Sequence, residues 1–160
     1  MTNDVEKQIV GWREWISLPE LGVSALKVKV DTGARTSALH AFNVETFEID
    51  KRKKVRFGIH PLQRRRDIEI FCTADIVDER VVTDSGGHRE KRLVIKTPVQ
   101  LGNFKWEVEF TLTDRDTMRF RALLGRTAME SRLIVNPEES FLSGKSLINE
   151  YLNVLKRETL

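Results

Sequence analysis

One short segment of the chain combines a carboxylate with the turn residues that could hold it for catalysis. Asp31 follows an alternating apolar run and is followed by Thr32, Gly33 and Ala34, so a strand would deliver the carboxylate into a tight turn. The hydroxyl of Thr32 can lock such a turn, and Gly33 lets a backbone N–H come close to the carboxylate and donate to it. These residue types make Asp31 a candidate catalytic residue that activates water, and by themselves they fit an ordinary turn at the end of a strand as well.

A second segment strengthens this prediction, because Asp-Thr-Gly alone is a short and common sequence. Leu123, Leu124, Gly125 and Arg126 form an apolar run that ends in a glycine and an arginine, and Gly125 follows Gly33 by 92 positions. We expect a short helix directly after Arg126, within residues 127–132.

In this order the two segments resemble those of the retropepsins, which have Asp-Thr-Gly-Ala early, a flap hairpin, and then an apolar-apolar-Gly-Arg strand before a helix. The longer string from Lys29 to Ala41 is similar to a bacterial family first described as ATP-dependent zinc proteases and later regrouped as retropepsin-like endopeptidases. Members of that family often accompany ATP-grasp glutamate ligases. The resemblance covers residues 10–142 and implies that the late segment, Leu123 to Arg126, crosses beneath the catalytic turn and supports it.

The elements that must position these residues read as short strands. Ala25 to Val30 alternates apolar with charged side chains, which is the period of a half-buried strand. Paired glycines between two β runs predict a hairpin from Arg80 to Arg92. We expect further strands within residues 9–18, 42–49, 55–59, 68–77, 104–112 and 120–124. The predicted fold is mainly β, a closed barrel of the acid-protease type in one domain over 1–160, with its core at 10–142 and a C-terminal helix at 145–157.

The resemblance implies a mechanism that one aspartate cannot carry out. One carboxylate must take a proton from water while a second, protonated one hydrogen-bonds the substrate carbonyl. Because the chain offers a single Asp-Thr-Gly, the simplest completion is a homodimer with a two-fold axis between two copies of Asp31. We expect hydrolysis of peptide or isopeptide-like amide bonds, with the hairpin tip closing over the substrate; the residues of that tip are Asp84, Ser85, Gly86 and Gly87.

Basic residues beside the turn point to an acidic substrate, such as a glutamate-rich tail. Lys29 and Arg35 flank the turn and Arg126 ends the late segment, and arginine pairs with carboxylates in a bidentate manner. Arg35 stands where many retropepsins have an acid that pairs with the late arginine. Arg126 therefore either pairs with Glu130 or stays free for substrate, and an equal alternative is that the arginines only hold the dimer together. Lys29 would also favour an ionised Asp31, which favours a rival function, a non-catalytic dimeric binding module of the same fold.

Other function classes find less support in the sequence. The three histidines, His40, His60 and His88, match no local zinc motif, so we expect no metal and no other cofactor, and a zinc-dependent peptidase is the weaker rival. The lone Cys72 lies in an apolar strand pattern and is expected to be buried. A net charge of +3 and basic runs without interleaved aromatic residues argue against nucleic acid. No membrane span or signal peptide is evident, so we expect a cytoplasmic protein.

Overall fold

The computed structural model describes residues 6–63, 65–83, 86–114, 119–145 and 147. Its secondary structure is 60% strand and 6% helix, which confirms the prediction of a mainly β protein. The predicted C-terminal helix at 145–157 lies almost entirely outside the described residues, and so do Asp84 and Ser85 of the hairpin tip.

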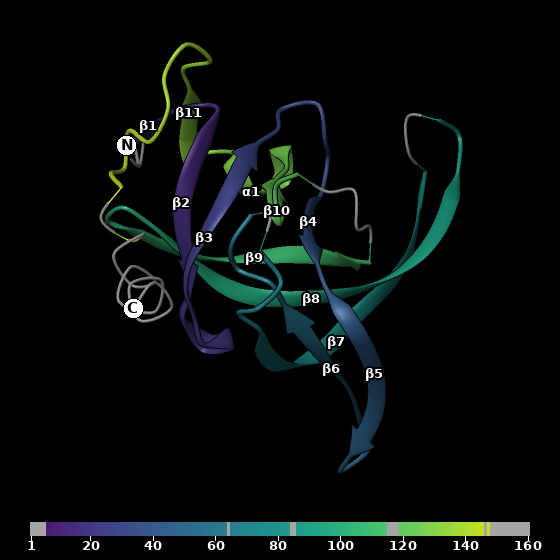
Figure 1. Cartoon of the computed structure of the whole chain (residues 1–160). Helices are drawn as coiled ribbons and strands as arrows, with labels where there is room; N and C mark the ends of the chain where they lie inside the picture. Colours follow the sequence, from purple (N-terminus) through teal and green to yellow (C-terminus); the bar gives the residue numbers. More distant parts are fainter. Residues whose placement is uncertain (1–5, 64, 84–85, 115–118, 146, 148–160) are drawn as a thin grey trace, which may run out of the picture.

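Six strands close into a barrel, as the sequence predicts (Figure 1). The sheet order places β10 between β3 and β4, and a further pairing of Ser17 with Gln100 joins β2 to β8 and closes the ring. In order around the barrel, the strands are β2 (Arg13–Leu18), β3 (Val23–Val30), β10 (Ala122–Leu124), β4 (Ser37–His40), β9 (Phe104–Thr113) and β8 (Arg89–Leu101).

The remaining elements extend the barrel or flank it. The sheet continues from β8 through β7 (Ile70–Thr83) and β6 (Arg52–Ile59) to β5 (Phe42–Ile49) at its edge. A separate two-stranded parallel sheet joins β1 (Gln8–Val10) to β11 (Leu133–Val135). In the described part of the chain the short helical elements are η1 (Pro19–Leu21) and α1 (Arg126–Met129), and α1 confirms the short helix expected after the late segment.

The barrel interior is filled by the apolar faces of its strands. On β3, Leu26 and Val28 are fully buried while Lys29 is exposed, which is the alternation seen in the sequence. Burial of a large aliphatic or aromatic side chain contributes about 1.5–3 kcal/mol, so such residues dominate the stability of the barrel. The largest fully buried apolar side chains include Ile16, Leu26, Leu39, Phe57, Phe110 and Leu124.

Several expectations about strands differ from the structure. The predicted strand at 9–18 is divided between β1 and β2 by a break at Gly11 and Trp12, and a Cβ atom on Gly11 would lie 2.2 Å from the carbonyl oxygen of Glu139. Strands β11 and β4 were not expected at all. All four side chains of β4 are buried, and a strand buried on both faces shows no alternation to detect.

The flap-like hairpin is present and longer than expected. Pairing of β7 with β8 runs from Ile76 and Ile95 up to Thr83 and Arg89, and it includes the predicted pair Arg80 and Arg92. In Figure 1 the hairpin rises away from the barrel on the side where the loop between β3 and β4 also lies. No helix within the described part of the chain is long and apolar enough to cross a membrane.

Candidate active site

The Asp31 turn begins directly at the end of β3 and is held by backbone hydrogen bonds. The N–H of Asp31 donates to the carbonyl oxygen of Leu124 at 2.8 Å, and the N–H of Ala34 donates to the carbonyl oxygen of Asp31 at 3.3 Å. The N–H of Gly33 donates to Oδ1 of Asp31 at 2.9 Å, which is the contact that the sequence predicts for this glycine. Asp31 is half-buried, and Thr32 and Gly33 are exposed beside it.

The late segment lies against this turn, as the resemblance implies. Strand β10 runs parallel to β3, with Leu123 beside Lys29 and Leu124 beside Val30, and antiparallel to β4 on its other side. The turn therefore leaves the barrel and returns to it on either side of one short central strand. Since β10 is hydrogen-bonded on both edges, it forms a rigid base for the carboxylate.

Gly125 and Arg126 fasten the end of β10 to the loop after Asp31. A Cβ atom on Gly125 would lie 2.7 Å from the carbonyl carbon of Thr36, so the two backbones can approach only with glycine at this position. The N–H of Arg126 donates to the carbonyl oxygen of Ala34 at 2.8 Å, and its Nη1 donates to the carbonyl oxygen of Thr32 at 3.0 Å.

The pairing of Arg126 with Glu130, one of the two alternatives considered from the sequence, does not form. Among the described residues the guanidinium of Arg126 has no carboxylate partner, and its hydrogen-bond acceptor is the carbonyl oxygen of Thr32 in the turn. Arg126 is exposed. It is therefore both a support of the turn and an open cation beside it.

Two hydroxyl residues that sequence reasoning missed complete the support. The hydroxyl of Ser37, which is fully buried, accepts the N–H of Gly125 at 3.0 Å. The hydroxyl of Thr127 donates to the carbonyl oxygen of Arg35 at 3.0 Å, next to the N–H of Thr127 at 3.1 Å from the same oxygen. The sequence indicates these two residues only weakly: Ser37 lies a few positions after Gly33, and Thr127 lies a few positions after Gly125.

The predicted basic residues lie at the surface around the turn. Lys29 and Arg35 are exposed, and neither forms an ion pair with Asp31 in the part of the chain that the structure describes. Gly86 and Gly87 are exposed at the hairpin tip, where Gly87 has a φ of 82° that favours glycine. The geometry thus leaves positive charge accessible on the exposed side of the site.

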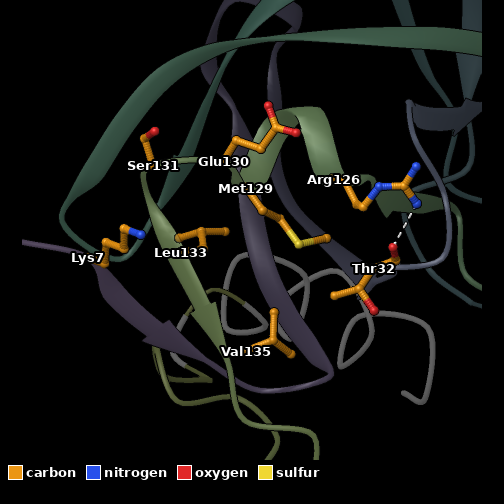
Figure 2. A pocket seen from close by; sticks show the side chains of 8 residues that line it. All are labelled: Lys7, Thr32, Arg126, Met129, Glu130, Ser131, Leu133 and Val135. Atoms are coloured by element: carbon orange, nitrogen blue, oxygen red, sulfur yellow. Dashed lines mark hydrogen bonds between the residues drawn. The ribbon is translucent and has the colours of Figure 1, made fainter.

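A shallow hollow of about 740 Å³ opens next to the turn (Figure 2). Figure 2 shows Arg126 reaching toward the carbonyl of Thr32 at one end, Lys7 at the opposite end and apolar side chains between them. The hollow has an apolar floor and charged ends, a combination that could contact the surface of another protein chain. Its lining residues are Lys7, Thr32, Arg126, Met129, Glu130, Ser131, Leu133 and Val135.

The other residues considered for catalysis lie in different surroundings. His40 is 1% exposed, as expected of a packed residue, and His88 is exposed on the hairpin. His60 stacks on Phe42 with ring centroids 4.1 Å apart. Within the described ranges no three histidine, cysteine or acidic side chains gather as metal ligands. Burial raises the pKa of the Cys72 thiol to about 12, so this thiol is a poor nucleophile at neutral pH.

Comparisons with known proteins agree with this geometry. A family model described as "RimB-like: Retropepsin-like aspartic endopeptidase RimB" matches residues 9–146. Two proteins named "Probable alpha-L-glutamate ligase" are similar to this chain, one from Desulfotalea psychrophila (46% identity over 137 residues) and one from Shewanella pealeana (48% over 139 residues). These matches cover 86% and 87% of this chain, and the chain spans 30% of the length of each relative.

A solved structure extends the comparison to the fold. A Legionella pneumophila protein, described as having unknown function, superposes with a TM-score of 0.72 at 25% identity. The match covers 85% of this chain and 98% of that chain. Nearly the whole of that protein therefore has the same arrangement of strands.

Proposed function

The chain belongs to the RimB-like family of retropepsin-like aspartic endopeptidases, and we propose that it hydrolyses amide bonds with water activated between two copies of Asp31. The observation that carries the proposal is the state of the Asp31 carboxylate. One oxygen accepts the N–H of Gly33, no other described donor reaches this side chain, and the residue is half-exposed at the end of a strand. A fixed carboxylate with lone pairs free on its open side can bind and deprotonate water.

The proposed reaction needs two such carboxylates sharing one proton. The ionised Asp31 takes a proton from water, and the oxygen of that water forms a bond to the carbonyl carbon of the substrate. The protonated Asp31 of the other copy hydrogen-bonds the carbonyl oxygen as negative charge develops there. Collapse of the tetrahedral intermediate breaks the C–N bond, and the departing nitrogen receives a proton from the pair, which returns to its starting state.

A homodimer would supply the second carboxylate, and the surface around Asp31 supports that arrangement. Two carboxyl groups that share a proton lie about 3 Å apart, so the dimer axis must pass beside the turn. Thr32 and Gly33 are exposed there, and the hollow with its apolar floor opens next to Thr32.

The charge around the site favours an acidic substrate. Lys29, Arg35 and Arg126 are exposed cations on and around the turn, and Arg126 has no carboxylate partner among the described residues. The similarity to part of longer proteins named as glutamate ligases supports the same substrate class, because an amide hydrolase joined to such a ligase would meet glutamyl products. We therefore propose peptides or tails rich in glutamate.

The test is cleavage of a set of peptides with acidic, neutral and basic tails, followed by mass spectrometry. The native protein should release fragments from the acidic members, and Asp31→Asn should release none. Asp50→Asn is the matched control, because Asp50 is exposed in the turn between β5 and β6 with a left-handed φ of 52° that asparagine tolerates. Equal cleavage by the native protein and Asp31→Asn would exclude the proposed function.

A second candidate, the non-catalytic binding module, is favoured by one observation. The exposed Lys29 and Arg35 stand close in sequence to Asp31, and cations beside a carboxylate oppose the sharing of its proton. This candidate expects the acidic peptides to bind the native protein and Asp31→Asn equally tightly and to remain intact with both. Binding measured by fluorescence anisotropy on the same peptides therefore separates the two functions.

A further inference from the structure

One arginine of the hairpin is buried although it lies only four residue pairs from the tip. Arg92, on β8, has 8% of its side chain exposed, and its register partner on β7 is Arg80. Its Nε donates to Oε2 of Glu90 at 3.0 Å and its Nη1 donates to the hydroxyl of Thr111 at 3.4 Å. A buried guanidinium is costly unless it is paired and hydrogen-bonded, so these contacts fix where this part of the hairpin lies.

The Thr111 hydroxyl continues from this arginine to the candidate active site. It donates to the carbonyl oxygen of Ser37 at 3.3 Å, and the side chain of Ser37 accepts the N–H of Gly125 at 3.0 Å. Gly125 in turn packs against the backbone of Thr36. A continuous set of buried polar contacts therefore connects the hairpin, through β9 and β4, to the base of the Asp31 turn.

The opposite arginine shows that this connection is particular to Arg92. Arg80 is half-exposed, and its guanidinium bonds Asp78 and Glu109, with Nη2 2.8 Å from Oε2 of Glu109. Those partners lie at the surface of β7 and β9. Arg80 thus ties the hairpin to Glu109 at the surface of β9, whereas Arg92 bonds the Thr111 hydroxyl, which in turn bonds Ser37 on β4.

We propose that Arg92 is a positioning residue that couples the hairpin to the Asp31 turn through Thr111 and Ser37. The inference rests on the proposed function, in which Asp31 activates the water that attacks the substrate. The contacts of Arg92 set the point on β8 from which the hairpin can move. Between Arg92 and the tip, β8 has left the barrel. Movement of the hairpin then alters the support of Ser37 and Gly125 beneath the carboxylate.

Amide hydrogen exchange tests the coupling without any substrate. Thr111→Val removes only the central hydroxyl and keeps the shape of the side chain, so the protein should still fold. We expect the amides of Gly125 and Arg126 to exchange about tenfold faster, after correction for any change in global stability. Lys96→Met is the matched control, because Lys96 also lies on β8 and pairs with a glutamate, Glu107 at 3.6 Å, but is half-exposed.

Arg92→Lys separates positioning from plain stabilisation. A lysine at position 92 keeps a cation for Glu90. It lacks the planar guanidinium that bonds Glu90 and Thr111 together, so the amide of Gly125 should exchange as fast as in Thr111→Val. Unchanged exchange at Gly125 in both variants, or the same acceleration in Lys96→Met, would overturn the coupling.

A kinetic measurement completes the test when an acidic peptide is cleaved in an Asp31-dependent manner. Arg92→Lys and Thr111→Val should then lower kcat with KM nearly unchanged, because the geometry of the turn and not the cationic surface is altered. A rise in KM with native kcat would contradict a positioning role. If no peptide is cleaved by the native protein, the proposed function fails, and the exchange experiment still decides the coupling.

Discussion

Two carboxylates of this molecule, Glu14 and Asp31, lie in opposite kinds of surroundings. Glu14, on β2, is fully buried and accepts four hydrogen bonds, from the N–H groups of Gly11 and Leu142 and from both the N–H and the hydroxyl of Ser143. The donor–acceptor distances are 2.7, 2.9, 3.0 and 2.5 Å respectively. Asp31 is half-exposed, and among the described residues the N–H of Gly33 is the one donor to its side chain.

The difference separates a structural acid from one that is available for chemistry. The donors of Glu14 occupy both of its oxygens and fasten the segment around residue 142 to β2, so no water or substrate can approach. The single donor of Asp31 fixes the direction of the carboxylate and leaves the rest of it open. The number of donors around an acid, and not burial alone, therefore distinguishes these two roles.

The largest expected effect is on stability, in Glu14→Gln. The amide keeps one acceptor oxygen and turns an NH₂ group toward backbone donors, so buried N–H groups lose their partners. We expect a loss of about 3 kcal/mol in the free energy of unfolding, measured by urea denaturation. Glu130→Gln, at an exposed position in the hollow, should change it by less than about 0.5 kcal/mol. A loss below about 1 kcal/mol in Glu14→Gln would contradict a structural role.

A smaller loss is expected from Gly125→Ala, which tests the close approach beneath the Asp31 turn. The added methyl would lie within 2.9 Å of backbone atoms of Arg35 and Thr36, which cannot rotate away. We expect about 2 kcal/mol of destabilisation by thermal or urea unfolding.

Gly33→Ala is the control for that variant, because its Cβ would meet only the Oδ1 atom of Asp31, at 3.1 Å. It should be clearly less destabilising than Gly125→Ala. If the two glycine variants were equally stable, the packing of β10 against the loop would not be as tight as described.

Ser37→Ala should have a still smaller effect, because one hydrogen bond is lost and no atom is added. The N–H of Gly125 would then be buried without its partner, at a cost of about 1 kcal/mol. Ser24→Ala, at an exposed position on β3, should cost nothing measurable in the same denaturation experiment. If the two serine variants were equally stable, the hydrogen bond from Gly125 to Ser37 would not contribute to the support of the turn.

The smallest effect on stability is expected from Asp31→Asn. The asparagine can accept the same N–H of Gly33, and the open side of the group faces no described donor. The free energy of unfolding should change by less than about 0.5 kcal/mol. A loss as large as that of Glu14→Gln would mean that Asp31 is a structural acid like Glu14, and the comparison would fail.

The sequence predicts the two segments of the site better than the contacts that hold them. Asp31 to Ala34 and Leu123 to Arg126 carry a recognisable spacing of residue types, and the structure places them side by side. Their roles in catalysis remain predictions. The alternating side chains of β3 likewise predict a strand, and the paired glycines predict the hairpin of β7 and β8. Both patterns depend only on residues close in sequence.

The contacts of Glu14, Ser37 and Arg92 could not be predicted in this way. The partners of Glu14 include Leu142, 128 positions away, and Ser37 meets Gly125 across 88 positions. Such pairs depend on the closed barrel and on a strand, β4, that has no alternating pattern. The homodimer that the single Asp-Thr-Gly implies stays a prediction, because a pattern within one chain does not show which of its surfaces a second copy would cover.

The central claim is that two chains share one site, and the most direct test is sedimentation equilibrium over a wide range of protein concentration. The account predicts a species of about twice the 18.5 kDa chain mass, whose proportion rises with concentration in the native protein and in Asp31→Asn alike. A mass of one chain at every concentration would leave Asp31 without its twin and would contradict the proposed mechanism.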